Sequence, residues 1–511
     1  MKHLLFITAF SLTGCLLAPA VTPFTISAQV TGRNTVTIDG VELREEQLFD
    51  LTLHPAPLKK PALKHRLTPA TLDTIDRNAA TFYYRTVTQA KGVDARIRQY
   101  NREQPETPLP YLFDDYDAWM NSDSLEEDTV EQMRNYVNQH KTMFEELERA
   151  YRSSYCNWDL IPDDKEDFNW YEINLDDIQY LRQVCRVLAV ANRVALYDGD
   201  YERAIKCIAY GLKIAHDLES AEIMVAGLVG VACAGISIDN LQKVIQETDS
   251  PNLYWALATL PKPLANFNPA IRRELSILLN GSMFETLANT ESLELTASAW
   301  RKLFLKDVKT TITFGNITES ESTLEAMFGV VMLRAYPIAK HALVERGFDP
   351  DEVAAMPAAQ VIAIQQKHAA QIVNDEILKT LNLDYPTKLK YLNDNRSQFL
   401  DSASLTASPN SETQLLPFQG FFFPAVQQTV SAEARIQRNL AGLQVIEAIR
   451  AHLAVAGELP NSLADITVLA VPVNPATNQP FEYQINEYGA TLKLYGLHQG
   501  VHQFYQLRVA K

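Results

Sequence analysis

The chain has 511 residues, of which 47% are hydrophobic and 21% are charged, a composition typical of an ordinary globular protein. This composition excludes a disordered chain, a collagen and a polytopic membrane protein, and the length corresponds to about three domains. The formal net charge of −16 argues against nucleic acid as a partner, because a phosphate backbone attracts Lys and Arg.

Residues 1–28 predict a signal peptide. Lys2 supplies the positive charge, and residues 4–17 form an apolar run too short to span a bilayer. Two processing routes remain open. Cleavage after Ala28 would release a periplasmic or secreted protein, whereas residues 12–15 have the form of a lipobox, which would make Cys15 the site of lipidation and membrane anchoring. A retained N-terminal anchor is the third alternative.

Residues 29–66 form a short N-terminal segment, where alternating residues at 35–38 precede Asp39-Gly40 and predict a hairpin. From residue 67 the pattern becomes helical and continues to residue 400. Thr68 is a suitable N-cap and Pro69 suits the first helical position, which predicts a helix ending near Gly92.

A second helical run follows a proline-rich loop. Ser124 and Glu127 have the spacing of a capping box, and they predict one helix that continues to about Arg152.

Residues 176–247 carry the strongest helical pattern. Apolar residues recur every three or four positions over 176–197, and Asp198-Gly199-Asp200 predicts a tight turn into a second helix at 201–217. The pair resembles a tetratricopeptide hairpin, although Asn192 and His216 replace the usual small residue and closing proline. The fold class expected is therefore mainly α, an irregular stack of helical hairpins.

A third helix is predicted at 220–247, and its residues 223–238 carry no charge. Sixteen residues rise about 24 Å, which is less than the roughly 30 Å hydrocarbon core of a bilayer. The small residues Gly227 and Gly230 are typical of close helix packing. We therefore expect a buried central helix rather than a membrane span.

Further helices are predicted at 268–290, 318–347 and 355–381, followed by a linker at 401–430. Residues 431–511 predict a small C-terminal α+β module. Its elements are one amphipathic helix over 431–457 and four strands near 466–471, 481–485, 490–496 and 503–509.

Four sequence elements carry a resemblance to a family. They are residues 78–85, Cys156-Asn157-Trp158, Gly199-Asp200-Tyr201, and residues 251–263. Together they resemble a family of uncharacterised exported proteins from planctomycete-type bacteria. The resemblance covers residues 70–280 and implies a secreted helical protein, but it carries no activity and no catalytic residue. Separately, residues 472–483 are similar to a turn in pseudopilin-like modules of exported bacterial proteins. That turn usually has Asp before Pro and then Gly, and here Asn474 and Asn478 differ from it.

The motifs of common catalytic and metal sites are absent from the sequence. There is no H-E-x-x-H, no G-x-S-x-G, and no phosphate-binding glycine loop. His498 and His502 are spaced as a metal-binding pair would be on a helix, but Gly500 argues against a helix there. We therefore assign no catalytic, cofactor-binding or metal-binding residues and no cofactor.

Cysteines beyond Cys15 number four: Cys156, Cys185, Cys207 and Cys233. The last three lie among apolar residues of predicted helices, where Cys behaves as a small buried hydrophobe. No C-x-x-C spacing occurs, so neither a zinc knuckle nor a thioredoxin-like site is indicated. A disulfide between two of the four remains open.

Residues 103–180 are strongly acidic. They contain 21 Asp and Glu against 5 Lys and Arg, an excess equal to the net charge of the whole chain. Trp119, Trp158 and Trp170 lie in the same segment. Carboxylates among aromatic rings occur in sugar and cation sites, and Asp115, Asp117 or Asp163 beside a second carboxylate would be the catalytic arrangement of a glycosidase. The alternative is a solvated acidic surface, which such charge runs usually form.

Three functions remain. The first is a non-enzymatic helical-repeat interaction or scaffold protein of the cell envelope, which would bind a protein or peptide partner on a surface of stacked helices. The second is a carboxylate-dependent hydrolase, directed at polysaccharide through the acidic segment. The third is a structural or secretion-associated envelope module. We expect the first, a non-enzymatic protein, and the second keeps enzymatic activity open as the alternative.

Overall fold

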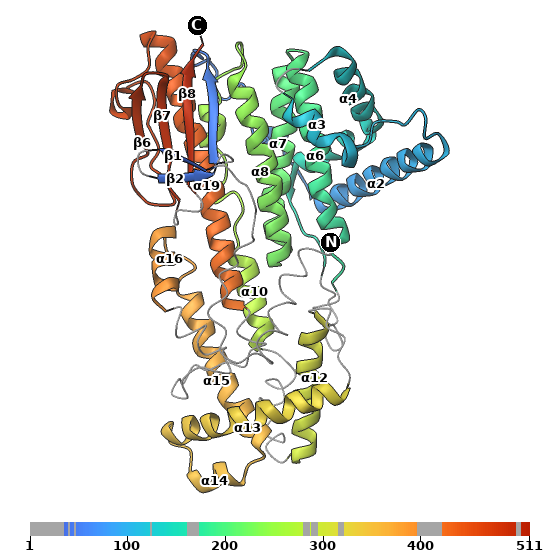
Figure 1. Ribbon diagram of the computed structural model, residues 1–511, viewed down its shortest axis with the longest axis vertical. Helices are drawn as coiled ribbons and strands as arrows, with labels where there is room; N and C mark the ends of the chain where they lie inside the picture. Colours follow the sequence, from blue (N-terminus) through green and yellow to red (C-terminus); the bar gives the residue numbers. More distant parts are fainter. Residues whose placement is uncertain are drawn as a thin grey trace. The chain divides into compact units, whose positions relative to one another are not determined.

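A computed structural model of the chain describes residues 35–38, 41–44, 47–122, 125–160, 173–279, 287, 295–314, 321–395, 422–496 and 502–510. The fold is mainly α with a small C-terminal α+β module, which confirms the expected fold class (Figure 1). The chain divides into two compact units. The larger contains Gly32–Phe168, Ile173–Ala270 and Thr429–Lys511, and the smaller contains mainly Ile271–Gln428. Each unit is described separately below.

In the described part of the larger unit, seven helices of ten or more residues precede residue 250. They are α2 (Ala80–Glu103), α3 (Leu112–Asn121), α4 (Glu127–Gln139), α5 (Lys141–Tyr151), α6 (Asp176–Tyr197), α7 (Tyr201–Asp217) and α8 (Met224–Gln246). The bounds of α6 and α7 confirm the helices predicted at 176–197 and 201–217. Asp200 caps α7, since its side chain accepts the Arg203 N–H at 3.0 Å. The short α9 (Tyr254–Ala258) follows α8.

The two earlier helix predictions need correction. The helix expected from Thr68 begins only at Ala80, because Ile75–Asn78 form strand β4, which pairs in parallel with β5 (Ser153–Tyr155). It then continues through Gly92 to Glu103. The single helix expected up to Arg152 is two helices, because the backbone of His140 leaves helical geometry, with ψ at 13°.

Helix α8 is central to the larger unit, as predicted. Among the described residues it is the one helix long and apolar enough to cross a membrane, and 67% of its most apolar stretch is buried within the molecule. Gly230 allows α8 to approach α7 closely, as expected from the small residues of α8. A Cβ atom at this position would lie only 2.9 Å from the carbonyl oxygen of Ala215 in α7, so a larger residue would collide with it. Helices α6, α7 and α8 all pack on one another.

The C-terminal module consists of α19 (Phe422–Ala456) and a four-stranded sheet of order β3-β8-β7-β6. Helix α19 begins before the predicted start at 431, so residues 422–430 are helical and do not belong to the linker predicted at 401–430. Strands β6 (Glu482–Asn486), β7 (Gly489–Leu494) and β8 (Gln503–Val509) are antiparallel, as expected. The strand predicted at 466–471 is wrong, because those residues are irregular after a short turn of 3-10 helix at Leu463–Asp465.

The fourth strand of this sheet comes from the opposite end of the chain. β3 (Leu48–Leu53) pairs in parallel with β8, from Leu48 opposite Phe504 to Leu53 opposite Val509. Leu51 and Leu53 are buried, whereas Asp50 and Thr52 point outward, the alternation expected of a strand with one covered face. The predicted hairpin at 35–38 is confirmed as β1 (Thr35–Ile38) and β2 (Val41–Arg44).

The smaller unit contains α12 (Ala297–Phe314), α13 (Glu321–Glu345), α14 (Pro350–Ala355), α15 (Ala358–Leu378) and α16 (Tyr385–Asp394). Helix α13 confirms the helix predicted at 318–347 and has Pro337 in its interior, and α15 confirms the one at 355–381. Helix α10 (Asn268–Leu279) corresponds to the prediction at 268–290. Helices α12 and α16 were not predicted.

Candidate functional site

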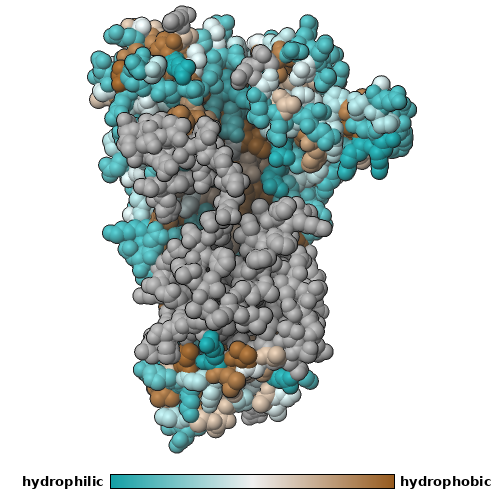
Figure 2. Space-filling view, in the orientation of Figure 1, coloured by the Kyte–Doolittle hydropathy of each residue, from teal (hydrophilic) through white to brown (hydrophobic). Residues whose placement is uncertain are grey.

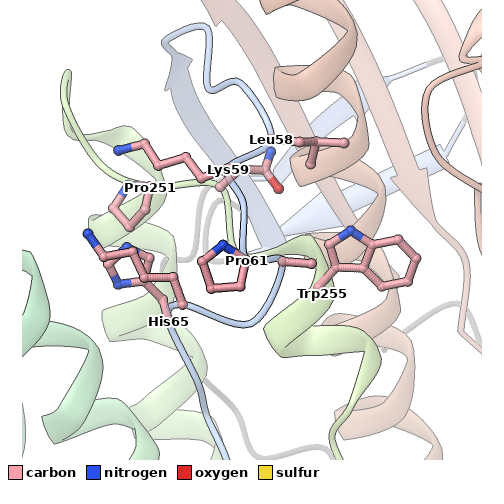
Figure 3. Close-up of a pocket in the computed structure, with 9 residues that line it drawn as sticks. Leu58, Lys59, Pro61, His65, Pro251 and Trp255 are labelled. Atoms are coloured by element: carbon pink, nitrogen blue, oxygen red, sulfur yellow. The ribbon is translucent and has the colours of Figure 1, made fainter.

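A shallow pocket lies between the loop after β3 and the segment that leads into α9. Nine residues line it: Leu58, Lys59, Pro61, Ala62, Lys64, His65, Pro251, Asn252 and Trp255. In Figure 3, Pro61 is seen between His65 and Trp255, with Leu58 and Lys59 above it. We call this the Trp255 pocket.

Buried polar groups fix the two segments that form the pocket. Arg450 on α19 is fully buried, and its guanidinium donates to both carboxylate oxygens of Glu447, at 3.0 and 3.1 Å, and to Ser250 Oγ at 2.8 Å. Its Nε donates to the carbonyl of His54 at 3.1 Å, and its own carbonyl accepts the Ala56 N–H at 3.1 Å. A pair buried in this way is favourable only when hydrogen bonds satisfy both partners, as they do here.

Asn252 completes this network at the base of the pocket. Its amide nitrogen donates to the carbonyls of Ala56, at 3.2 Å, and Glu447, at 2.8 Å. Its side-chain oxygen accepts the Tyr254 N–H at 3.0 Å. Asn252 therefore positions the pocket walls, and the groups left for a ligand are the lysines, His65 and Trp255.

The loop side of the pocket is basic in an otherwise acidic protein. Residues 51–72 contain no Asp or Glu, but they contain Lys59, Lys60, Lys64 and Arg66. All four side chains are exposed. Among the residues that the structure describes, no carboxylate lies within ion-pair distance of the three lysines. Burial lowers the pKa of His65, and the nearby Lys64 lowers it further, so the ring favours its neutral form.

The opposite side of the pocket is apolar. Trp255 is 42% exposed and Leu58 is 41% exposed. Tyr254 takes the inward position instead: it is buried, and its hydroxyl donates to the carbonyl of Ala470 at 2.5 Å. Because Tyr254 anchors α9, the indole of Trp255 is left at the surface, where it meets Tyr254 edge-on at 5.1 Å between ring centroids.

The acidic segment does not assemble into a site in the part of the chain that the structure describes. Asp114 and Asp117 are exposed on α3, and the side chain of Asp115 accepts the Tyr111 N–H at 2.7 Å, as a helix-capping group would. Trp119 and Trp158 are buried. The end of α2 and the loop after it, at the right of Figure 1, are mainly hydrophilic in Figure 2.

Metal ligands are not brought together either, within the described ranges. No group of three His, Cys, Asp or Glu side chains there has the arrangement of a metal site. His502 is engaged otherwise, because its Nδ1 accepts the Gly496 N–H at 3.0 Å. Asp163, Trp170, His498 and the processing candidates Cys15 and Ala28 lie outside the described residues.

The four cysteines are free thiols. Cys185, Cys207 and Cys233 are buried, as predicted, and Cys156 is partly exposed. Burial raises the pKa of Cys156 and also that of Cys207, the latter to about 12, so neither is an activated thiolate, and exposure is what separates Cys156 from the buried cysteines.

The residues that carry the family resemblance form structural contacts. Asn78 donates to the carbonyl of Asn157 at 2.8 Å and accepts its N–H at 2.8 Å. Tyr83 stacks on Trp158 at 5.4 Å between ring centroids and donates to the buried carboxylate of Asp217 at 2.8 Å. These contacts join α2, the segment after β5 and the end of α7. These residues therefore have a structural role in helix packing, and their contacts give no indication of a catalytic role.

Comparisons with known proteins add no assignment: no family model, no curated protein and no solved structure matches the chain. The Trp255 pocket was missed in the sequence analysis. The signal was present in the 22 residues from 51 to 72, where four Lys and Arg occur without a single acid. Its aromatic half, Trp255, lies almost 200 positions away and gave no local indication.

Proposed function

We propose that this chain is an exported cell-envelope protein that binds a partner protein, and that the surface around the Trp255 pocket contacts an acidic, partly apolar segment of that partner. One observation carries the proposal: two exposed lysines, Lys59 and Lys64, line the same pocket as the exposed Trp255 and have no ion-pair partner among the described residues, in a protein with a net charge of −16. The lysines would pair with carboxylates, and Trp255 and Leu58 would contact apolar side chains.

The charge distribution supports selectivity for such a segment. The protein as a whole repels anions, so an acidic ligand is attracted only where positive charge is concentrated. Exposed charge pairs contribute about 0.2 to 1 kcal/mol each, whereas an aromatic residue at the centre of an interface contributes about 2 kcal/mol or more. Most of the affinity should therefore depend on Trp255, and the dependence on salt should come from the lysines.

Fluorescence anisotropy with two labelled peptides tests the proposal. One peptide alternates Glu with Leu and Tyr, and the other has Gln in place of Glu. We expect the acidic peptide alone to bind, and Trp255→Ala to weaken binding by about tenfold or more. The double variant Lys59→Gln/Lys64→Gln should reduce affinity by a few-fold and flatten its salt dependence.

Lys141→Gln is the matched control, because Lys141 is an exposed lysine at the start of α5, away from the pocket. Equal binding of the two peptides, or equal losses in Lys141→Gln and in the pocket variants, would refute the proposed site. Export is tested separately by mass spectrometry of the mature N-terminus. A start after Ala28 or a lipid on Cys15 would each support it, and an intact Met1 in envelope fractions would contradict it.

A further inference from the structure

A buried polar cluster lies within the larger unit, where α2, α4 and α6 approach one another. Asp94 of α2 is 4% exposed, Tyr136 of α4 is 0% exposed, and His140, between α4 and α5, is 1% exposed. Tyr180 of α6 donates a hydrogen bond from its hydroxyl to Asp94 Oδ2. The rings of Tyr136 and His140 lie 4.7 Å apart between centroids. The cluster is separate from the Trp255 pocket.

Three polar atoms of this cluster lack a hydrogen-bond partner among the described residues: Asp94 Oδ1, Tyr136 Oη and His140 Nε2. Burial of an unpaired polar group costs about 1 to 3 kcal/mol, so three together are a substantial cost. Burial raises the pKa of Tyr136, and the nearby charge of Asp94 raises it further; the Asp94 charge acts on His140 as well. The three groups therefore sense one another electrostatically.

The hydrogen-bonding roles of these atoms follow from their partners. His140 Nδ1 lies 3.0 Å from the carbonyl of Tyr136, and a carbonyl can only accept, so Nδ1 carries the proton. In the neutral ring Nε2 is then an acceptor. Asp94 Oδ1 is an acceptor as well, and the Tyr136 hydroxyl can donate or accept. A ligand that satisfies the cluster must therefore bring at least two donor hydrogens.

Charge decides between the two kinds of small donor, a neutral one such as water and a cationic one. Burial raises the pKa of Asp94, which records the cost of placing its negative charge in the protein interior. Among the described residues no Lys or Arg side chain forms an ion pair with this carboxylate. The nearby charge of Arg98, whose Nε donates to the backbone carbonyl of Asp94 at 3.3 Å, lowers the pKa of Asp94 only in part. A cationic donor offsets that cost by its charge as well as by its hydrogen bonds, whereas a water molecule supplies hydrogen bonds alone.

We propose that Asp94, Tyr136 and His140 form a binding site for a small ammonium group. Its N–H donors would pair with Asp94 Oδ1 and His140 Nε2, its charge would compensate the carboxylate, and Tyr136 Oη would accept a third N–H. Ammonium ion itself and primary amines are the ligands of this class.

Thermal melting of the full chain at pH 7 in ammonium chloride tests the site, with potassium chloride at equal ionic strength as the reference. Potassium has the charge and nearly the size of ammonium but no N–H donors. We expect the melting temperature to rise with ammonium concentration and to stay at its reference value with potassium. Asp94→Asn should remove the ammonium-specific rise, and Tyr136→Phe, which deletes only one hydroxyl, should reduce it.

Asp114→Asn serves as the control, because Asp114 is an exposed carboxylate on α3. It should keep the full rise. Equal shifts in ammonium and potassium would show a general salt effect, and no shift in either would show that water alone satisfies the cluster; each result overturns the proposal. So would a rise that persists in both Asp94→Asn and Tyr136→Phe. Should Asp94→Asn fail to fold, calorimetric titration of the wild-type protein and Tyr136→Phe with ammonium decides the question.

Discussion

Two glycines of α8 lie five residues apart and differ sharply in their surroundings. A Cβ atom on Gly230 would lie 2.9 Å from the carbonyl oxygen of Ala215 and 3.5 Å from Cβ of Leu218. A Cβ atom on Gly235 would have no neighbour within 4 Å. We therefore expect the same substitution, Gly to Ala, to be tolerated at Gly235 and to be costlier at Gly230.

The magnitudes follow from two contributions. Replacing Gly by Ala inside a helix stabilises it by about 0.5 to 1 kcal/mol at either position, because Gly loses more conformational freedom on folding. At Gly230 the methyl group also collides with a backbone atom of a packed helix, which cannot rotate away, and overpacking of this kind costs about 1 to 3 kcal/mol. Gly235→Ala should therefore be more stable than the wild type, and Gly230→Ala less stable than Gly235→Ala by about 1 to 3 kcal/mol.

Urea unfolding followed by circular dichroism measures both variants, and comparing them with each other removes the contribution of helix propensity. Both substitutions lie in the same helix of the larger unit, so any transition of the smaller unit affects them equally. Equal stability of the two variants would refute the close approach of α7 and α8 at Ala215, and with it the burial of α8 inferred from its small residues.

Three further predictions concern thiols, the buried ion pair and the acidic surface. Maleimide labelling of the native protein should modify Cys156 first and reach Cys185, Cys207 and Cys233 only after denaturation; fast reaction at all four would contradict the assigned helix faces. Arg450→Met should destabilise the protein by about 3 to 5 kcal/mol in urea unfolding, because the buried charge of Glu447 is left without its cationic partner, and adding Glu447→Gln should restore part of this. Changing Asp114, Asp115 and Asp117 together to Asn should alter stability by about 0.5 kcal/mol or less per residue, and neither calcium nor magnesium should shift the wild-type melting curve. A calcium shift lost in the triple variant would instead favour a cation site there.

Local patterns predicted the parts of the fold that depend on neighbours in sequence. The apolar spacing over 176–217 and the Asp-Gly-Asp turn were sufficient for α6 and α7, because one helix face and one turn determine them. Strand β3 could not be found in this way. Its partner β8 lies about 450 residues further on, and a parallel pair has no connecting turn to mark it. The sequence therefore predicts the fourth strand at residues 466–471, whereas in the structure the fourth strand is β3.

The candidate site was missed for a related reason. The acidic surplus over 103–180 favoured a carboxylate site, yet the carboxylates that the structure describes are spread over α2 to α6, and most of them are exposed. The smaller basic surplus over 51–72 becomes a pocket only because Arg450 and Asn252 hold that loop against α9. Such a contact depends on hydrogen bonds to backbone carbonyls, which any residue type can supply, and so it leaves no pattern in the sequence.

The hydrogen bond at His502 should make the free energy of unfolding depend on pH. Its Nδ1 accepts the Gly496 N–H, so a proton there would break that bond. Burial lowers the pKa of His502, and the charge of Arg438 lowers it further. The unfolded chain therefore binds the proton near pH 6.5 while the folded protein does not, so stability falls as pH drops below about 6.5 and levels off below the folded pKa. In His502→Asn the amide oxygen can still accept from Gly496 but does not titrate. Urea unfolding between pH 7.5 and 5 should thus show a flatter pH dependence for this variant than for the wild type, since His65 and His140 contribute equally to both; identical slopes would mean that His502 does not titrate in this range.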